Sequence, residues 1–135
     1  MPEPVPLRRP APTSEPAAPA APRHRRVLVV EDEYLLAEDL RRGLEDAGAE
    51  VLGPVPSVAD ALALLATEAP PDAAILDVNL GGEMVFPVAD VLRERGVPFM
   101  FATGYDQWSL PQAYTDVPRC EKPFDVGRCL RTLFG

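Results

Sequence analysis

The sequence has little cysteine and no long hydrophobic run, and both features narrow the kinds of protein it can encode. Its two cysteines, Cys120 and Cys129, form neither a CxxC pair nor a cluster with metal-ligand spacing. We therefore expect two small buried thiols in a reducing compartment, the cytoplasm, and no disulfide framework. No apolar run approaches the ~20 residues that span a bilayer, so we expect no membrane insertion.

The first 25 residues differ in composition from the rest of the chain. They hold eight of its 17 prolines, mixed with alanine, and they have no apolar periodicity. The basic pair Arg8 and Arg9 is not followed by the apolar run of a signal peptide. We predict that residues 1–25 form a disordered, partly polyproline-II arm and that residues 26–135 form one folded domain.

The predicted domain is strongly acidic. The chain carries a net charge of −8, and residues 1–25 contribute +2 through four arginines and two glutamates, which leaves −10 for the rest. Negative charge at this density repels a nucleic-acid backbone. We therefore expect no nucleic-acid partner.

Short apolar runs alternate with amphipathic segments through the rest of the sequence. Such runs are typical of strands buried on both faces, and their alternation with helices predicts an α/β fold with a parallel sheet and right-handed crossovers. The expected strands are residues 27–30, 51–55, 73–77, 97–102 and 117–121. The expected helices are residues 34–47, 58–68, 87–95 and 126–134.

Several residues mark the ends of these elements. Ser57 with Asp60 resembles a capping box for the second helix, and Asp125 is positioned to cap the last one. Gly53 and Pro54 weaken the second strand, so we expect it at a sheet edge. Residues 104–116 have no apolar stripe, and there we expect a loop or a poor helix.

Polar side chains stand where the expected strands end. They are Glu31, Asp32, Asp77, Thr103 and Lys122. Because the carboxyl ends of parallel strands meet at one edge of a sheet, we expect these residues to lie close together. Three adjacent carboxylates repel one another by several kcal/mol, so we predict that a cation neutralises them.

The chemistry of this set points to phosphoryl transfer. Carboxylates with open positions suit Mg²⁺, and the backbone carbonyl of Asn79 can supply a further ligand. The Lys122 ammonium and the Thr103 hydroxyl suit phosphoryl oxygens. Asp77 is left as a carboxylate nucleophile that can form an acyl phosphate.

Each of these residues also has an ordinary structural explanation. Glu31 and Asp32 can be acids that complement a helix dipole, and Asp77 can cap a turn. Thr103 can belong to a turn, and Lys122 to a surface loop. Only the occurrence of all five residue types, each after its own strand and in this order, favours a site.

Four stretches of sequence carry a resemblance to a known family. They are VLVVEDE at residues 27–33, ILDVNL at residues 75–80, Thr103, and EKPF at residues 121–124. On these motifs, residues 26–135 closely resemble the receiver domain of two-component response regulators. The resemblance implies a flavodoxin-like, doubly wound sheet of five parallel strands in the order 2-1-3-4-5. It also implies a partner, a histidine kinase or histidine phosphotransfer protein, that donates a phosphoryl group in the presence of Mg²⁺.

The resemblance assigns roles to four acidic or amide residues. Asp77 maps to the phosphoacceptor, and Asp32 maps to a direct metal ligand. Glu31 maps to a neighbour that usually reaches the metal through water, and most receivers have aspartate there. Asn79 maps to the position whose carbonyl binds the metal, and its side chain lies where receivers tune hydrolysis of the acyl phosphate.

The resemblance also covers the phosphoryl contacts and the switch residues. Thr103 and Lys122 map to the groups that contact the phosphoryl group. Three residues before the lysine, many receivers have an aromatic switch side chain, and here Arg119 takes that place. Tyr105 is a candidate substitute for the switch and a candidate gate against the hydrolytic water, although it can equally be a loop aromatic.

A narrower resemblance concerns PFMFATGYD at residues 98–106, which looks like the motif of the "FATGUY" receivers. These are typically small, stand-alone regulators of alphaproteobacteria. The sequence ends directly after the last expected helix, so we expect no DNA-binding or catalytic effector domain. We expect either an output through contact with a downstream protein or a role as a phosphate sink or shuttle. Trp108, Leu110 and Tyr114 either form part of a docking surface or cover the sheet.

Two other functional classes compete with this interpretation. A phosphatase of the haloacid-dehalogenase type also uses aspartate, threonine, lysine and Mg²⁺, but its nucleophile precedes the acid pair in the chain, and here Glu31 and Asp32 precede Asp77. A receiver-like scaffold that works without phosphorylation needs no complete set of site residues. We therefore expect a phosphoacceptor that is not an enzyme beyond its own phosphorylation and autodephosphorylation.

Overall fold

A five-stranded parallel sheet forms the centre of the molecule. The computed structural model describes residues 25–103, 110–122 and 125–135, so the predicted arm lies outside the described residues except for Arg25. The strand order is β2-β1-β3-β6-β7, which confirms the predicted order because β6 and β7 are the fourth and fifth strands of this sheet. The strands are β1 (Arg26–Val30), β2 (Glu50–Val55), β3 (Ala73–Asp77), β6 (Phe99–Thr103) and β7 (Arg119–Glu121).

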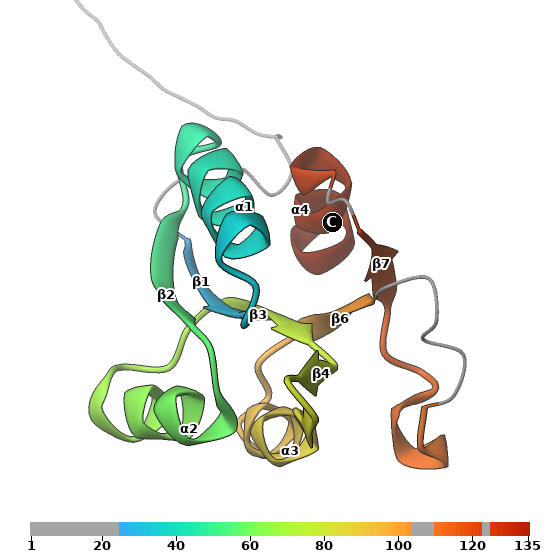
Figure 1. The fold of residues 1–135 in the computed structure, drawn as a ribbon. Helices are drawn as coiled ribbons and strands as arrows, with labels where there is room; N and C mark the ends of the chain where they lie inside the picture. Colours follow the sequence, from blue (N-terminus) through green and yellow to red (C-terminus); the bar gives the residue numbers. More distant parts are fainter. Residues whose placement is uncertain (1–24, 104–109, 123–124) are drawn as a thin grey trace, which may run out of the picture.

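Helices cover both faces of the sheet (Figure 1). One face carries α1 (Tyr34–Asp46) and α4 (Val126–Phe134), and the other carries α2 (Val58–Thr67) and α3 (Phe86–Glu94). The strands supply both cores because successive side chains point to opposite faces. Val27 and Val29 of β1 join the core under α1 and α4, whereas Leu28 and Val30 join the core under α2 and α3.

The signals for element ends agree with the structure. The Ser57 side chain accepts a hydrogen bond from Asp60 N at 3.1 Å, and the Asp125 side chain accepts one from Arg128 N at 3.1 Å. The strand β2, which contains Pro54, lies at the edge of the sheet as predicted. The strand β7 is shorter than predicted and begins after Pro118, a residue that has no N–H to donate to a ladder.

A small hairpin after β3 was not predicted. The strands β4 (Asn79–Leu80) and β5 (Glu83–Met84) pair antiparallel, and the turn between them consists of Gly81 and Gly82. Both glycines have positive φ angles, 65° and 100°, as a two-residue hairpin turn with right-handed strand twist requires. The Gly-Gly pair was therefore an available signal for this turn.

Between β6 and β7, the described residues contain a single turn of 3-10 helix, η1 (Gln112–Tyr114). This agrees with the expectation of a loop or poor helix. The ring of Tyr114 is buried, stacks on Phe86 with ring centroids 4.7 Å apart and meets the edge of Phe101, and its hydroxyl donates to Asp90. Tyr114 therefore covers the sheet, as does Leu110, whereas Trp108 lies outside the described residues.

No helix in the described ranges combines the length and the apolar character needed to cross a membrane.

Candidate functional site: an acidic cluster at the carboxyl edge of the sheet

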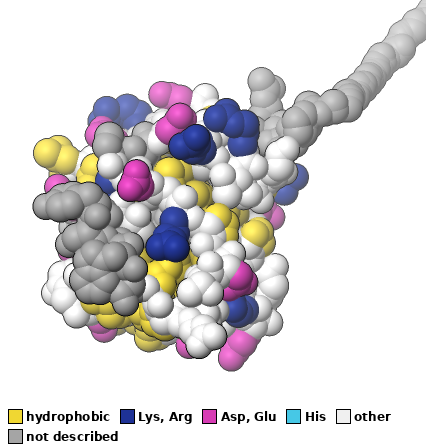
Figure 2. Space-filling view, turned by 90° about the vertical axis from the view of Figure 1, so that its right-hand side faces the viewer, with side chains coloured by type: hydrophobic (Ala, Val, Ile, Leu, Met, Phe, Trp, Pro, Cys, Tyr) yellow, Lys and Arg dark blue, Asp and Glu magenta, His cyan; other side chains and the backbone are white. Residues whose placement is uncertain are grey.

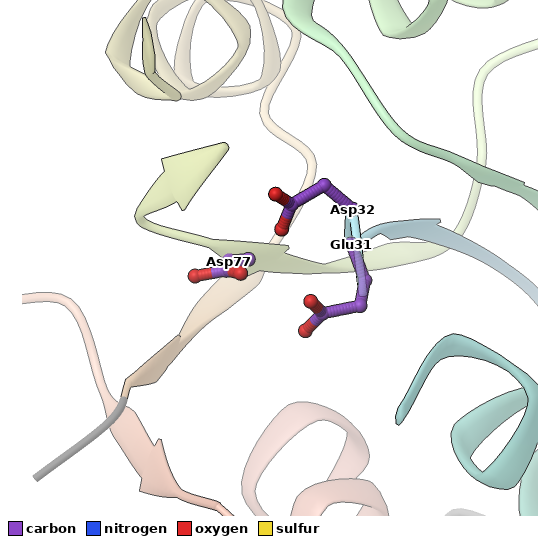
Figure 3. A group of neighbouring side chains, drawn as sticks. All are labelled: Glu31, Asp32 and Asp77. Atoms are coloured by element: carbon purple, nitrogen blue, oxygen red, sulfur yellow. The ribbon is translucent and has the colours of Figure 1, made fainter. Parts of the chain in front are cut away.

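Three carboxylates meet at the carboxyl edge of the two central strands. Glu31 and Asp32 directly follow β1, and Asp77 is the last residue of β3, which pairs with β1 in parallel. One carboxylate oxygen from each residue lies within 4.8 Å of the other two. Figure 3 shows the three carboxylates turned toward a common space. The sequence predicted this juxtaposition, and the structure brings the three residues together.

Burial makes two of these carboxylates costly to ionise. Glu31 is 3% exposed and Asp77 is 6% exposed, whereas Asp32 is exposed. Burial raises the pKa of Glu31 to about 7, and the nearby charge of Asp77 contributes to that rise. Burial also raises the pKa of Asp77, although hydrogen bonding to Lys122 partly offsets it. Full ionisation of the three carboxylates is therefore unfavourable without a neutralising cation.

Lys122 supplies a positive charge to this cluster. Its Nζ lies 3.1 Å from Glu31 Oε1 and 3.1 Å from Asp77 Oδ2. Partial burial lowers the pKa of Lys122, but the two carboxylates outweigh burial and hold that pKa above its ordinary value. The ammonium is therefore charged and fixed between an acid from β1 and an acid from β3.

The strand ladder explains why Lys122 and Thr103 lie beside Asp77. Asp77 pairs with Ala102 of β6, so Thr103 ends the neighbouring strand, where it is 4% exposed. Lys122 N donates to Thr103 O at 3.0 Å, which continues the β6–β7 ladder beyond its last paired residues. The backbone thus carries both side chains to the same edge.

The β4–β5 hairpin, which was not predicted from the sequence, packs against the acidic cluster. Asn79 N donates to Asp77 Oδ1 at 3.2 Å, while the Asn79 side-chain oxygen accepts from Gly82 N at 2.6 Å. A Cβ atom added to Gly81 would lie 3.5 Å from Asp32 Oδ2. The turn therefore packs next to the carboxylates, and Asn79 uses its side chain to hold the turn.

The donor set fits a hard divalent cation. Glu31 Oε2 accepts from Glu33 N at 3.0 Å. Glu31 Oε1 has no hydrogen-bond partner within the described ranges, although it forms the ion pair with Lys122. A buried carboxylate oxygen without a hydrogen bond, next to two further carboxylates, is a donor that a metal such as Mg²⁺ satisfies. Glu31, Asp32 and Asp77 are thus suited to hold such an ion.

The structure describes only one of the two predicted switch residues. Arg119 lies exposed on β7, and Tyr105 falls outside the described residues. The buried aromatic next to β6 is instead Tyr114, packed against Phe86 and Phe101. The sequence left two alternatives for Tyr114, a docking surface or a cover for the sheet, and the structure shows the second.

The chain is similar to several known proteins. A scan against models of known protein families finds no match. The sensory transduction protein LytT of Bacillus cereus is 37% identical over 112 residues, which cover 80% of this chain and 45% of LytT. The chain therefore spans about half the length of the curated relatives it matches.

Among solved structures, some proteins match this chain over nearly their whole length. SdrG from Sphingomonas melonis Fr1 is 43% identical with a TM-score of 0.72, and the match covers 82% of this chain and 96% of SdrG. A CheY-like response regulator receiver domain from Methylobacillus flagellatus is 26% identical with a TM-score of 0.68, and 82% of this chain and 98% of that domain are covered. This chain belongs to the response regulator receiver family. The receiver fold, and the resemblance noted in the sequence, are thereby confirmed.

A second solved structure of SdrG shows its BeF3-activated conformation, and this receiver matches it at 41% identity with a TM-score of 0.67, over 80% of this chain and 92% of that one. As a member of the family, the receiver is a component of two-component signalling.

Proposed function

We propose that residues 26–135 act as a phosphoacceptor response regulator. Asp77 accepts a phosphoryl group from the phosphohistidine of a histidine kinase or phosphotransfer protein, with Mg²⁺ bound, and the phosphorylated domain signals by contact with another protein in the cytoplasm. One observation supports this proposal above all others. Carboxylates from β1 and β3 converge within 4.8 Å, and a lysine from the end of β7 lies against two of them.

Asp77 is the nucleophile in this proposal. One of its oxygens attacks the phosphorus atom of the donor, a new P–O bond forms, and the P–N bond to the donor imidazole breaks. Backbone N–H donation from Asn79 and the charge of Lys122 orient the carboxylate before the attack. Orientation of this kind accounts for much of the catalysis in phosphoryl transfer.

Lys122 and Thr103 receive the transferred group. The Lys122 ammonium, now shared between Glu31 and Asp77, can turn to a phosphoryl oxygen once Asp77 is phosphorylated. The Thr103 hydroxyl at the end of β6 can donate to another phosphoryl oxygen. Glu31, Asp32, Asp77 and the Asn79 carbonyl would hold Mg²⁺, which supplies positive charge that offsets the phosphoryl oxygens.

This function involves no separate substrate that is turned over. The phosphoryl group is bound to the protein itself and leaves only by hydrolysis or onward transfer. In the order of the chain, the acid pair precedes the nucleophile, which disfavours the dehalogenase-type phosphatase. A scaffold that works without phosphorylation is the remaining alternative, and it predicts no acyl phosphate at Asp77.

The relatives give independent support. The structure of SdrG in its BeF3-activated conformation indicates that a receiver 41% identical to this chain responds to a phosphoryl mimic. We infer the same chemistry here. We also propose that the partners are proteins and not nucleic acid, because of the chain's net charge of −8.

The test is phosphorylation by a small acyl phosphate with Mg²⁺, followed by intact-mass measurement. We expect the wild-type protein to gain one phosphoryl group and the Asp77→Asn variant to gain none. Asp39→Asn is the matched control, because Asp39 lies on the exposed side of α1 with its side chain 71% exposed, and it should behave as the wild type. Removal of Mg²⁺ by a chelator should abolish the gain in the wild type and in Asp39→Asn.

A purified histidine kinase or phosphotransfer protein is the second donor to use. Phosphorylation by neither donor, with the protein shown to be folded by circular dichroism, would favour the scaffold. A gain that persists in Asp77→Asn would place the phosphoryl group on another residue and would contradict the assignment of Asp77.

A further inference from the structure

The two cysteines of the chain meet in the structure, although nine positions separate them in the sequence. Cys120 lies on β7 and Cys129 on α4, and their Sγ atoms are 3.4 Å apart. A disulfide bond is about 2.05 Å long, so the sulfur atoms need to approach by little more than ~1 Å. No other cysteine exists in the chain to compete for either partner.

The pair is accessible from one side only. Cys129 is fully buried, whereas Cys120 is 7% exposed and lines a pocket of about 490 Å³ beside β7. Figure 2 shows the side of the molecule on which β7 lies in Figure 1, and basic, acidic and hydrophobic side chains all reach this surface. Cys120 is therefore the sulfur that a small reagent from solvent reaches first.

We propose that Cys120 and Cys129 are a redox-active pair that a hydroperoxide converts into an intrachain disulfide linking β7 to α4. In the first step, the sulfur of Cys120 attacks a peroxide oxygen, the O–O bond breaks, and Cys120 becomes a sulfenic acid while water or an alcohol leaves. In the second step, the sulfur of Cys129 attacks that of Cys120. The S–S bond forms, and the sulfenic oxygen departs as water with the proton of Cys129.

The surroundings of Cys129 fit its place in the second step. Burial raises the pKa of the Cys129 thiol to about 12, with the adjacent Cys120 adding to that rise, so the thiol stays protonated and does not react with peroxide by itself. Contact at 3.4 Å compensates for low nucleophilicity, because the reaction is intramolecular. The two thiols are thus stable in a reducing compartment, and they form a disulfide only after Cys120 is oxidised.

The disulfide would act on the segment that carries the acidic cluster's lysine. Lys122 lies two positions after Cys120, and Asp125, which caps α4, lies four positions before Cys129. A covalent bond between the two cysteines therefore constrains both ends of this segment. Because a cross-link restricts the unfolded chain, oxidation should also raise the urea midpoint of unfolding.

The experiment treats the native, full-length protein with hydrogen peroxide, denatures it in a maleimide reagent and measures the intact mass. We expect the wild type to lose two hydrogen atoms and to take up no maleimide, whereas untreated protein takes up two. Dithiothreitol should restore both thiols. Peptide mapping should find Cys120 joined to Cys129, and the urea midpoint should rise on oxidation and fall again on reduction.

Two variants separate the roles of the sulfur atoms. With Cys129→Ala, we expect Cys120 to form a sulfenic acid that dimedone traps. With Cys120→Ala, we expect Cys129 to resist peroxide in the native state and to react only after denaturation. Both variants should retain the circular dichroism spectrum of the wild type. If a variant does not fold, peptide mapping of the oxidised wild type serves as the test in its place.

Three outcomes would overturn the proposal. They are disulfide-linked dimers whose yield rises with protein concentration, addition of oxygen atoms without loss of hydrogen, and survival of both thiols at peroxide doses that oxidise glutathione. The measurement uses unphosphorylated protein, so its result is independent of whether Asp77 accepts a phosphoryl group.

Discussion

The interior of the sheet and its carboxyl edge are made by the same strands but have opposite energetics. In β3, the residues from Ala73 to Leu76 are apolar and fully or almost fully buried, and the next residue, Asp77, is a buried carboxylate. The first four stabilise the fold by leaving water. Asp77 and Glu31 cost stability when ionised, because burial raises the pKa of both.

This difference indicates that the interior of the sheet provides stability and its carboxyl edge provides the reactive groups. The central strands hold their direction through apolar contacts on both faces, and so they can end in charges that repel one another. Because the carboxylates repel one another, this acidic cluster is stabilised most by a bound cation. Stability along the strands thus maintains reactivity at their ends.

The largest expected effect comes from breaking the interior. Phe101 on β6 is fully buried and touches the rings of Phe86, Phe99 and Tyr114. Phe101→Ala should lower the free energy of unfolding by about 3–5 kcal/mol, because it leaves a cavity and the neighbouring rings lose their contacts with Phe101. Urea denaturation followed by circular dichroism measures this loss.

Met84 on β5 provides the matched control for that variant. It is a large apolar residue that is 42% exposed, so Met84→Ala should change the free energy of unfolding by less than about 1 kcal/mol. Equal losses from the two variants would mean that the aromatic cluster does not hold the face of the sheet under α3.

A substitution at the carboxyl edge should have the opposite effect and raise the free energy of unfolding. The pKa of Glu31 is about 7 in the folded chain, against an ordinary value of 4.5, so the folded state binds the extra proton between those pH values. The stability that this protonation confers is complete below pH 4.5 and is lost as the pH rises through 7. Without metal at pH 8, Glu31→Gln should therefore raise the free energy of unfolding, by about 2–3 kcal/mol.

Urea titrations at pH 4.5 and pH 8 in a chelator measure this effect, with Glu83→Gln, an exposed glutamate on β5, as the control. The two proteins should nearly converge at the lower pH, where Glu31 is protonated in the folded state and about half protonated in the unfolded state. Mg²⁺ should then stabilise the wild type more than Glu31→Gln, because only the wild type keeps the full donor set. A stability gain that does not depend on pH would contradict the assigned cause.

Most of the fold could be predicted because each element carries a local signal. Apolar runs predicted the five strands, the Gly53 and Pro54 pair predicted that β2 lies at an edge, and Ser57 and Asp125 are the caps that the structure shows. The convergence of Glu31, Asp32 and Asp77 followed from the rule that parallel strands end at one edge. The roles of these residues in phosphoryl transfer stay predictions.

The features that were missed or left open depend on contacts between distant elements. The sequence left open whether Tyr114 belongs to a docking surface or covers the sheet, and its burial arises because β6 and α3 bring Phe101 and Phe86 to it. The contact between Cys120 and Cys129 likewise depends on how α4 lies against β7. Whether Tyr105, Asn79 and Arg119 tune hydrolysis or switching also stays a prediction.

The smallest expected effect lies far from the acidic cluster, at the beginning of α2. Ser57→Ala removes the side-chain oxygen that accepts from Asp60 N, and it should lower the free energy of unfolding by about 1 kcal/mol. Ser57→Asn, which retains a capping oxygen, should restore most of that loss. Because no ionisation is involved, urea titrations with and without Mg²⁺ should give the same difference at pH 6 and pH 8, in contrast to Glu31→Gln. A dependence of the Ser57→Ala loss on Mg²⁺ would show that the helix cap and the carboxyl edge of the sheet are energetically coupled. It would contradict the view that the rest of the fold and the charge of the edge contribute to stability independently.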